Sequence, residues 1–139
     1  MKGCYALLVY LPEGNSIRLR KTIYHFNKGY YVYIGSAMNG LEQRIHRHLR
    51  KNKKKHWHID YLIDYGEIKE VFYKESNQKE ECIIASQLNT HLQGFKGFGC
   101  SDCRCNSHLF HGSKEEIVSL LIKLGLKPFK TKHLKSSTV

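Results

Sequence analysis

The sequence predicts a single domain of the α/β (α+β) class, and three observations support this. Two apolar, β-rich segments lie close together near the N-terminus, at residues 3–11 and 30–36. Segments with a helical pattern follow them, at 39–50, 79–92 and 113–124. The chain has 139 residues and no internal repeat or linker, and single domains usually have about 100–150 residues.

The strands come first. Residues 3–11 are short and apolar, and they end at a turn signal, Pro12-Glu13-Gly14-Asn15. A short strand around 17–19 and a polar turn at 27–29 are expected next. Residues 30–36 form the second strong strand, and they are expected to pair with the first because both are apolar and close in sequence.

The first helix is expected at residues 39–50, where Asn39 can cap it. Residues 57–65 are ambiguous between a short helix and a strand, and a strand is expected at 68–73. A second helix is expected at 79–92, because apolar side chains recur there at helical spacing.

The last helix has clear boundaries. Ser113 with Glu116 three residues later is a capping box, and Gly125 stops the helix after Leu124. The glycine- and cysteine-rich segment before it, residues 94–112, is expected to be mostly loop.

The chain is strongly basic, with 23 Lys and Arg, 12 Asp and Glu, and a formal net charge of +11 at pH 7. Such a charge on a small domain attracts polyanions, of which nucleic acid is the commonest.

The domain is expected to span residues 1–126, with 127–139 as a basic, flexible tail. The charge is densest in residues 44–58, where Trp57 is expected in the core, with stacking on a base as the alternative. The side chains expected to contact phosphates there are Arg47, Arg50, Lys51, Lys53, Lys54 and Lys55.

Composition argues against several other classes. A hydrophobic fraction of 41% argues against disorder, and no apolar run approaches the roughly 20 residues that span a bilayer. The N-terminus starts with a strand-like pattern and shows no signal peptide. Five cysteines, an odd number, argue against a disulfide framework. We therefore expect a cytoplasmic protein with no membrane partner.

Four side chains form a candidate catalytic group. Tyr5 lies on the first strand and Tyr33 on the second, while Arg44 and His48 lie on one face of the following helix. Such a group suits phosphodiester cleavage, because an arginine fork binds phosphate oxygens and a divalent metal acts as a Lewis acid on the departing oxygen. A tyrosine can take the proton of the attacking water if a nearby cation lowers its pKa, and His48 can orient a tyrosine or the water.

The order Gly3-Cys4-Tyr5, Tyr33-Ile34-Gly35, Arg44 and His48 resembles the GIY-YIG nuclease superfamily. Its members include the incision subunit of bacterial nucleotide-excision repair and certain homing endonucleases. The wider sequence is more similar to a small uncharacterised branch, a domain of unknown function sometimes fused to endonuclease-III-like glycosylases. This match covers roughly residues 2–112. The strings that carry it are residues 30–37, 56–62, 97–105 and 107–110.

The resemblance implies a small central antiparallel sheet of about three or more strands flanked by helices. It also implies that the protein is a DNA endonuclease, active in DNA repair or processing, that uses one divalent ion, Mg²⁺ or Mn²⁺. Tyr5, Tyr33, Arg44 and His48 would then be catalytic, with Tyr33 as the proton acceptor and Arg44 on the phosphate. The implied partners are DNA, with RNA as an alternative, and a base-excision glycosylase.

The metal-binding glutamate departs from the family pattern. Typical members place it in the middle of a helix, and that position here falls on Ser86. Glu81, one turn earlier, is the best substitute ligand, and Asp60 or Asp102 are the other candidates for the oxygen that Mg²⁺ needs. The alternative function is a non-catalytic nucleic-acid-binding module that has lost the metal glutamate.

A cysteine-rich string gives the pattern C-x₂-C-x-C-x₂-H, whose residues are typical zinc ligands. All four residues lie in one loop, which is cramped for a tetrahedral site, and His111 or His56 could complete it instead. Zn²⁺ is therefore the less favoured cofactor, and packing of the cysteines under the sheet is the alternative. A small zinc-binding interaction protein is a third, less favoured function. The four residues are Cys100, Cys103, Cys105 and His108.

Overall fold

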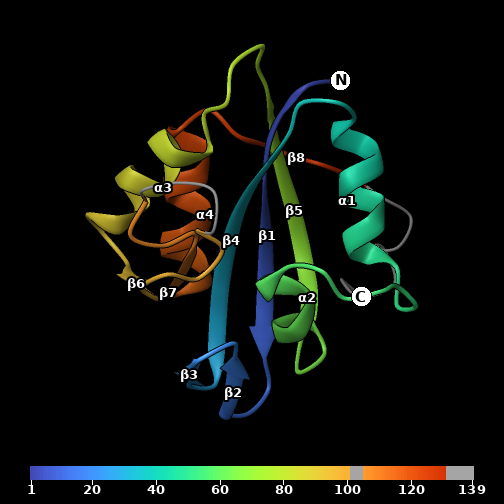
Figure 1. Ribbon diagram of the computed structural model, residues 1–139. Coiled ribbons are helices and arrows are strands. Elements are labelled where there is room, and N and C mark those ends of the chain that lie inside the picture. Colours follow the sequence, from blue (N-terminus) through green and yellow to red (C-terminus); the bar gives the residue numbers. More distant parts are fainter. Residues whose placement is uncertain (101–104, 131–139) are drawn as a thin grey trace.

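A six-stranded antiparallel sheet runs through the centre of the protein (Figure 1). The structure is a computed structural model that describes residues 1–100 and 105–130. The strand order is β6-β7-β4-β1-β5-β8, and β2 and β3 form a separate hairpin. The strands are β1 (Gly3–Leu11), β2 (Asn15–Leu19), β3 (Thr22–Phe26), β4 (Gly29–Ala37), β5 (Glu67–Glu75), β6 (Gln93–Gly94), β7 (Leu109–Gly112) and β8 (Lys127–Pro128). The helices are α1 (Leu41–Leu49), α2 (His58–Ile63), α3 (Glu81–Asn89) and α4 (Lys114–Lys123).

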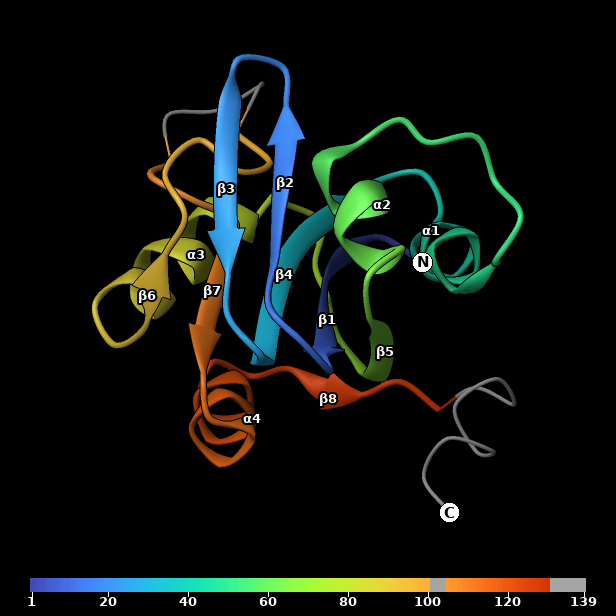
Figure 2. The same cartoon turned by 90° about the horizontal axis from the view of Figure 1, so that it is seen from below.

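Each face of the sheet has its own hydrophobic core. Successive side chains of a strand point to opposite faces, so Tyr5 and Leu7 of β1 pack with α1, α2 and the β2–β3 hairpin. Ala6 and Leu8 pack with α3 and α4 on the other face. Figure 2 shows the β2–β3 hairpin on the same side of the sheet as α2. Burial on both faces explains why β1 is an almost continuous apolar run, and the architecture confirms the predicted α+β class.

Two local predictions about helix starts have different outcomes. The ambiguous segment 57–65 forms α2, because the Asp60 carboxylate accepts a hydrogen bond from the Trp57 backbone N–H at 3.0 Å. The prediction that Asn39 caps α1 is wrong. Gly40 occupies the cap position, and no side chain makes a capping hydrogen bond there.

The structure also contains strands that the sequence patterns did not indicate. Residues 22–26 form β3, which pairs with β2. Part of the expected loop at 94–112 is strand, because β7 pairs with the edge of β4. Lys127 and Pro128 pair with β5 as β8, so the sheet extends past the expected domain end at residue 126. Of the expected tail, residues 131–139 lie outside the described part of the chain.

None of the helices in the described residues combines the length and the apolar character needed to cross a membrane.

Candidate active site

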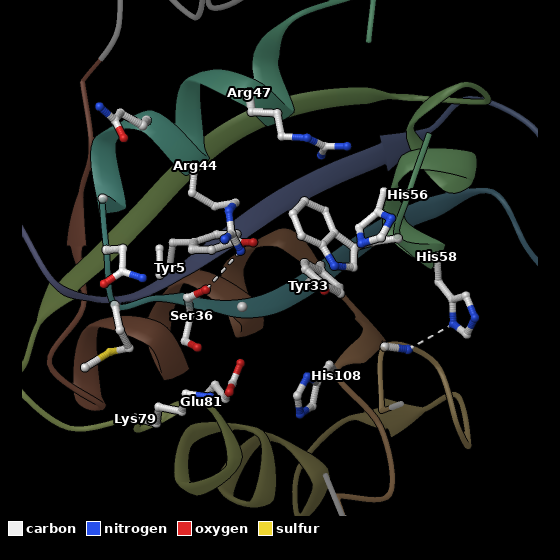
Figure 3. Close-up of a pocket in the computed structure, with 18 of the residues that line it drawn as sticks. Tyr5, Tyr33, Ser36, Arg44, Arg47, His56, His58, Lys79, Glu81 and His108 are labelled. Carbon is white, nitrogen blue, oxygen red and sulfur yellow. Dashed lines mark hydrogen bonds between the residues drawn. The ribbon is translucent and has the colours of Figure 1, made fainter. Parts of the chain in front are cut away.

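A cleft of about 940 Å³ lies between α1 and the N-terminal end of α3, beside the end of β4 (Figure 3). Three of the four predicted catalytic side chains line it, namely Tyr5, Tyr33 and Arg44. Glu81, the predicted metal ligand, lines it as well. The fourth predicted residue, His48, is buried behind Tyr5 with 1% of its surface exposed. The structure therefore brings together residues from four elements, β1, β4, α1 and α3.

Strand register places the two tyrosines. In the β1–β4 pair, Tyr5 lies opposite Gly35 and Leu7 lies opposite Tyr33, so the two tyrosines are diagonal neighbours on one face. Their ring centroids are 6.5 Å apart. A β-carbon on Gly35 would overlap the Tyr5 ring and hydroxyl. Glycine at this position therefore lets the Tyr5 ring lie across β4 and reach the cleft.

Tyr5 is held from behind by His48. The distance between the Tyr5 hydroxyl oxygen and His48 Nε2 is 2.7 Å. Burial outweighs the nearby Asp60 carboxylate and lowers the pKa of His48 to about 3, so the imidazole is neutral near pH 7. Its Nδ1 lies 3.9 Å from Asp60 Oδ1, and a carboxylate on that side favours the tautomer with the proton on Nδ1. Nε2 then accepts the hydrogen bond, and the Tyr5 hydroxyl donates it.

Both tyrosine hydroxyls are protonated at rest. Burial raises the pKa of Tyr5, although the neighbouring Arg44 guanidinium opposes the shift. Burial also raises the pKa of Tyr33 well above its ordinary value, and the charge of Glu81 adds to the effect. A tyrosine can accept a proton here only if positive charge near Glu81 offsets these effects.

Two arginines of α1 lie over the indole of Trp57, with guanidinium carbons 4.6 Å (Arg44) and 4.3 Å (Arg47) from the ring centroid. Arg47 also donates two hydrogen bonds to the Asp60 carboxylate, at 3.1 and 3.0 Å. Arg44 donates to an uncharged group, the Ser36 carbonyl, at 3.3 Å. Arg47 is thus committed to an ion pair, whereas Arg44 retains donors for a phosphate. Trp57 is half-buried and packs against the core.

Asp60 is not available as a metal ligand. Its side chain is fully buried in the ion pair with Arg47, and one of its oxygens also accepts hydrogen bonds from the backbone N–H groups of His56 and Trp57. Burial alone would raise the pKa of Asp60, but these hydrogen bonds outweigh it and lower the pKa. Asp60 therefore orders the α1–α2 connection. Asp102, the other candidate, lies outside the described residues.

Glu81 at the start of α3 is the carboxylate that lines the cleft among the described residues. Figure 3 shows it on the side of the cleft opposite Arg44. Ser86, where the family pattern would place the glutamate, is exposed and lines a separate pocket of about 380 Å³ on another side of α3. The candidate metal ligand thus lies one helical turn earlier than in the typical pattern.

The side chains predicted to contact phosphates divide into those that are engaged in contacts within the protein and those that are exposed without a carboxylate partner. Lys53 donates to the carbonyls of His48 and Arg50 at 2.9 and 2.8 Å, which caps the C-terminal end of α1. Lys55 forms an exposed ion pair with Asp64 at 3.0 Å. Arg50 is exposed and lines the cleft. Three members of the set are exposed and have no carboxylate partner among the described contacts: Arg50, Lys51 and Lys54.

Sequence reasoning missed two cations of the cleft, Arg20 and Lys79. Arg20 lies at the turn between β2 and β3, where its φ of 57° is left-handed. Its approach to the cleft depends on how the hairpin folds over the sheet, and no local pattern reports that. Lys79 lies just before α3, next to two glutamates, so its charge did not stand out.

The described members of the predicted zinc set do not all lie together. Cys100 donates to the Phe98 carbonyl, and Cys103 lies outside the described residues. Cys105 and His108 instead lie together with Cys82 of α3, which the zinc pattern did not include. Among the described residues, the two C-terminal members of the predicted set therefore lie against α3.

The fold and the cleft define a small α+β domain in which tyrosines, arginines and, among the described residues, one carboxylate gather at the end of its central strands. The chain belongs to the family described as "Domain of unknown function DUF123", which matches residues 4–127. The match includes every residue of the cleft named above. The search of curated proteins gave no match to this chain, and the search of solved structures gave none either.

Proposed function

We propose that this protein is a divalent-metal-dependent DNA endonuclease of the GIY-YIG type that acts in DNA repair or processing. The observation that carries the proposal is that Tyr5, Tyr33, Arg44 and Glu81 line one cleft. These residues stand at the positions that the sequence resemblance marks, apart from the shifted glutamate. A phosphodiester that enters the cleft would have an arginine on one side and a carboxylate on the other.

The donor chemistry of Glu81 fits a single Mg²⁺ or Mn²⁺ ion. Its carboxylate is half-buried and directed into the cleft, and Mg²⁺ is commonly held by one or two carboxylates while it keeps several waters. When bound, the ion would supply Lewis-acid activation of the departing oxygen.

The protein's own side chains have separate roles in this proposal. Arg44 binds a phosphate oxygen and stabilises the negative charge on the oxygens of the five-coordinate phosphate transition state. Tyr33 would act as the base only as the phenolate: with the charge of Glu81 offset, its hydroxyl proton is lost to solvent, and the phenolate oxygen then orients the attacking water and accepts its proton. Tyr5 donates to His48 and is fixed by it, and its oxygen lies next to the Arg44 guanidinium, so Tyr5 helps to position Arg44.

The charge of the cleft supports a nucleic-acid substrate. Five cationic side chains line it, against the single carboxylate of Glu81 among the described residues. Such a surface contacts the phosphate backbone without reading the bases. The five side chains are Arg20, Arg44, Arg47, Arg50 and Lys79.

Cleavage of supercoiled and branched DNA in Mg²⁺ or Mn²⁺ tests the proposal. Arg44→Ala and Tyr33→Phe are expected to reduce the rate by about 100-fold or more, the usual scale for loss of a positioned acid–base group. Tyr30→Phe is the matched control, because Tyr30 lies on β4 but does not line the cleft. If the wild type binds DNA with steep salt dependence but cleaves none of these substrates, the non-catalytic binding module replaces the endonuclease.

A further inference from the structure

A second group of metal-binding side chains lies next to the cleft. The sulfur atoms of Cys82 and Cys105 and a ring nitrogen of His108 all lie within 4.8 Å of one another. The distance between Cys82 Sγ and His108 Nε2 is 3.9 Å, although the two residues are 26 positions apart in the sequence. Cys82 comes from the first turn of α3, and the other two come from the segment that leads into β7.

We propose that Cys82, Cys105 and His108 bind a zinc-class divalent cation, at a site separate from the proposed Mg²⁺ ligand Glu81. Two thiolates and one imidazole are donors that zinc prefers and that Mg²⁺ does not. In a tetrahedral zinc site, metal–ligand bonds near 2.0–2.3 Å separate the ligand atoms by roughly 3.5–3.8 Å. The 3.9 Å between Cys82 Sγ and His108 Nε2 is close to that value, and the other pairs lie within 4.8 Å, so shifts of about 1 Å or less would bring all three donors to the ion.

The backbone around the cluster is held in place. The His108 N–H donates to the Phe98 carbonyl at 3.0 Å, and its carbonyl accepts from the Ile34 N–H at 2.9 Å. Gly97 donates to the Asn106 carbonyl at 2.9 Å. Phe98 is fully buried against the core. These contacts fix the base of the loop on the sheet before any ion binds, which lowers the entropic cost of assembling the site.

The position of the site gives it a structural role. Cys82 follows Glu81 directly, and both line the cleft together with His108. An ion held by Cys82, Cys105 and His108 would join the start of α3 to the segment before β7. The site would therefore fix the wall of the cleft that carries the proposed catalytic carboxylate.

Elemental analysis of the full chain, purified under reducing conditions, reconstituted with zinc and dialysed, tests this inference. The wild type is expected to retain about one zinc ion per chain, since one Cys₂His group binds one ion. Cys82→Ser is expected to lose it. Cys100→Ser is the matched control, because Cys100 belongs to the same loop but not to the cluster, and it is expected to retain the ion.

Retention of zinc by Cys82→Ser, or its loss from Cys100→Ser, would overturn the assignment. So would a zinc-free wild type, including one in which thiol titration finds Cys82 and Cys105 joined as a disulfide. If Cys82→Ser does not fold, cobalt substitution of the wild type decides the question. Thiolate-to-cobalt charge-transfer absorption is expected, and its absence contradicts the site. These measurements need no DNA, so their outcome is independent of the endonuclease proposal.

Discussion

At the scale of single residues, a buried polar chain fixes the position of Tyr5. Its hydroxyl meets His48 Nε2 at 2.7 Å, and His48 Nδ1 faces Asp60 Oδ1 at 3.9 Å. Nδ1 is also the buried side-chain atom that lacks a hydrogen-bond partner in the described structure. This arrangement works only while His48 is neutral, because a buried imidazolium next to two arginines of α1 is unfavourable.

This makes the stability of the protein depend on pH through His48. The pKa of His48 is about 3 in the folded state against 6.5 ordinarily. The unfolded chain therefore binds the extra proton, and stability falls as the pH drops from about 6.5 toward 3. Between pH 7 and pH 5 we expect a His48-dependent loss of about 2 kcal/mol in the free energy of unfolding.

Urea unfolding of the wild type and of His48→Gln at both pH values measures this contribution. The variant is less stable at pH 7, but it has no imidazole at position 48 to protonate on unfolding, so it should lose less stability between pH 7 and pH 5. The other histidines titrate in both proteins, and their contributions cancel in the comparison. Equal losses in the two proteins would show that His48 is not buried in the neutral form.

At the scale of elements, Asp60 joins α1 to α2. Its carboxylate accepts from Arg47 and from the backbone N–H groups of His56 and Trp57, and the ion pair holds Arg47 over the Trp57 ring. The segment between the two helices contains most of the dense basic charge. The Asp60 carboxylate therefore ties the start of α2 to α1 across this basic segment.

Asp60→Asn is expected to destabilise the protein by about 3–5 kcal/mol, because it leaves a largely buried arginine without its partner. The control is Asp64→Asn, which removes the exposed, solvent-screened ion pair with Lys55 and should change the stability far less. Chemical denaturation at pH 7 compares the two variants. Similar costs for both would contradict the structural role of Asp60.

The elements differ in how far their local sequence determines them. The capping box predicted where α4 begins, and the structure confirms it, because the Ser113 hydroxyl oxygen accepts a hydrogen bond from the Glu116 N–H at 3.1 Å. The strand β7 could not be predicted, because its four residues follow a glycine- and cysteine-rich segment and depend on pairing with the edge of β4. Local patterns thus identified the central strands and helices, but not the edges that depend on tertiary contacts.

The same distinction applies to the candidate site. Tyr5 and Tyr33 could be placed together from the expected pairing of two strands. Glu81 was selected by its residue type, and the structure places it in the cleft. The approach of Cys82 to His108 could not be foreseen, because it requires the packing of α3 against the segment before β7.

At the scale of the whole molecule, the positive charge around the cleft is available to a polyanion. Arg50 and Lys54 are exposed near the C-terminal end of α1, and Arg50 lines the cleft. Lys114 and Lys123 are exposed on α4, which packs on the opposite face of the sheet. Two pairs of cations on opposite sides of the protein thus allow a charge-matched comparison.

Arg50→Ala/Lys54→Ala is expected to weaken DNA binding and to make the slope of log K against log[salt] shallower by about 2, since each lost phosphate contact removes about 0.9. Lys114→Ala/Lys123→Ala removes the same charge and should leave the slope nearly unchanged. Fluorescence anisotropy over a range of salt concentrations measures both. Equal effects of the two variants would indicate a response to net charge without a defined binding face.

The central claim is that the carboxylate of Glu81 serves metal-dependent DNA cleavage in this cleft. Glu81→Gln and Glu80→Gln are a matched pair, because Glu80 is adjacent in sequence but pairs with Lys74 at 2.9 Å and does not line the cleft. The direct measurement is the DNA cleavage rate of both variants as a function of Mg²⁺ and Mn²⁺ concentration. We predict that Glu81→Gln lowers the rate by about 100-fold or more, the scale of losing several kcal/mol of metal-based charge stabilisation, while Glu80→Gln cleaves like the wild type. Full activity of Glu81→Gln, or equal loss in both variants, would contradict the claim.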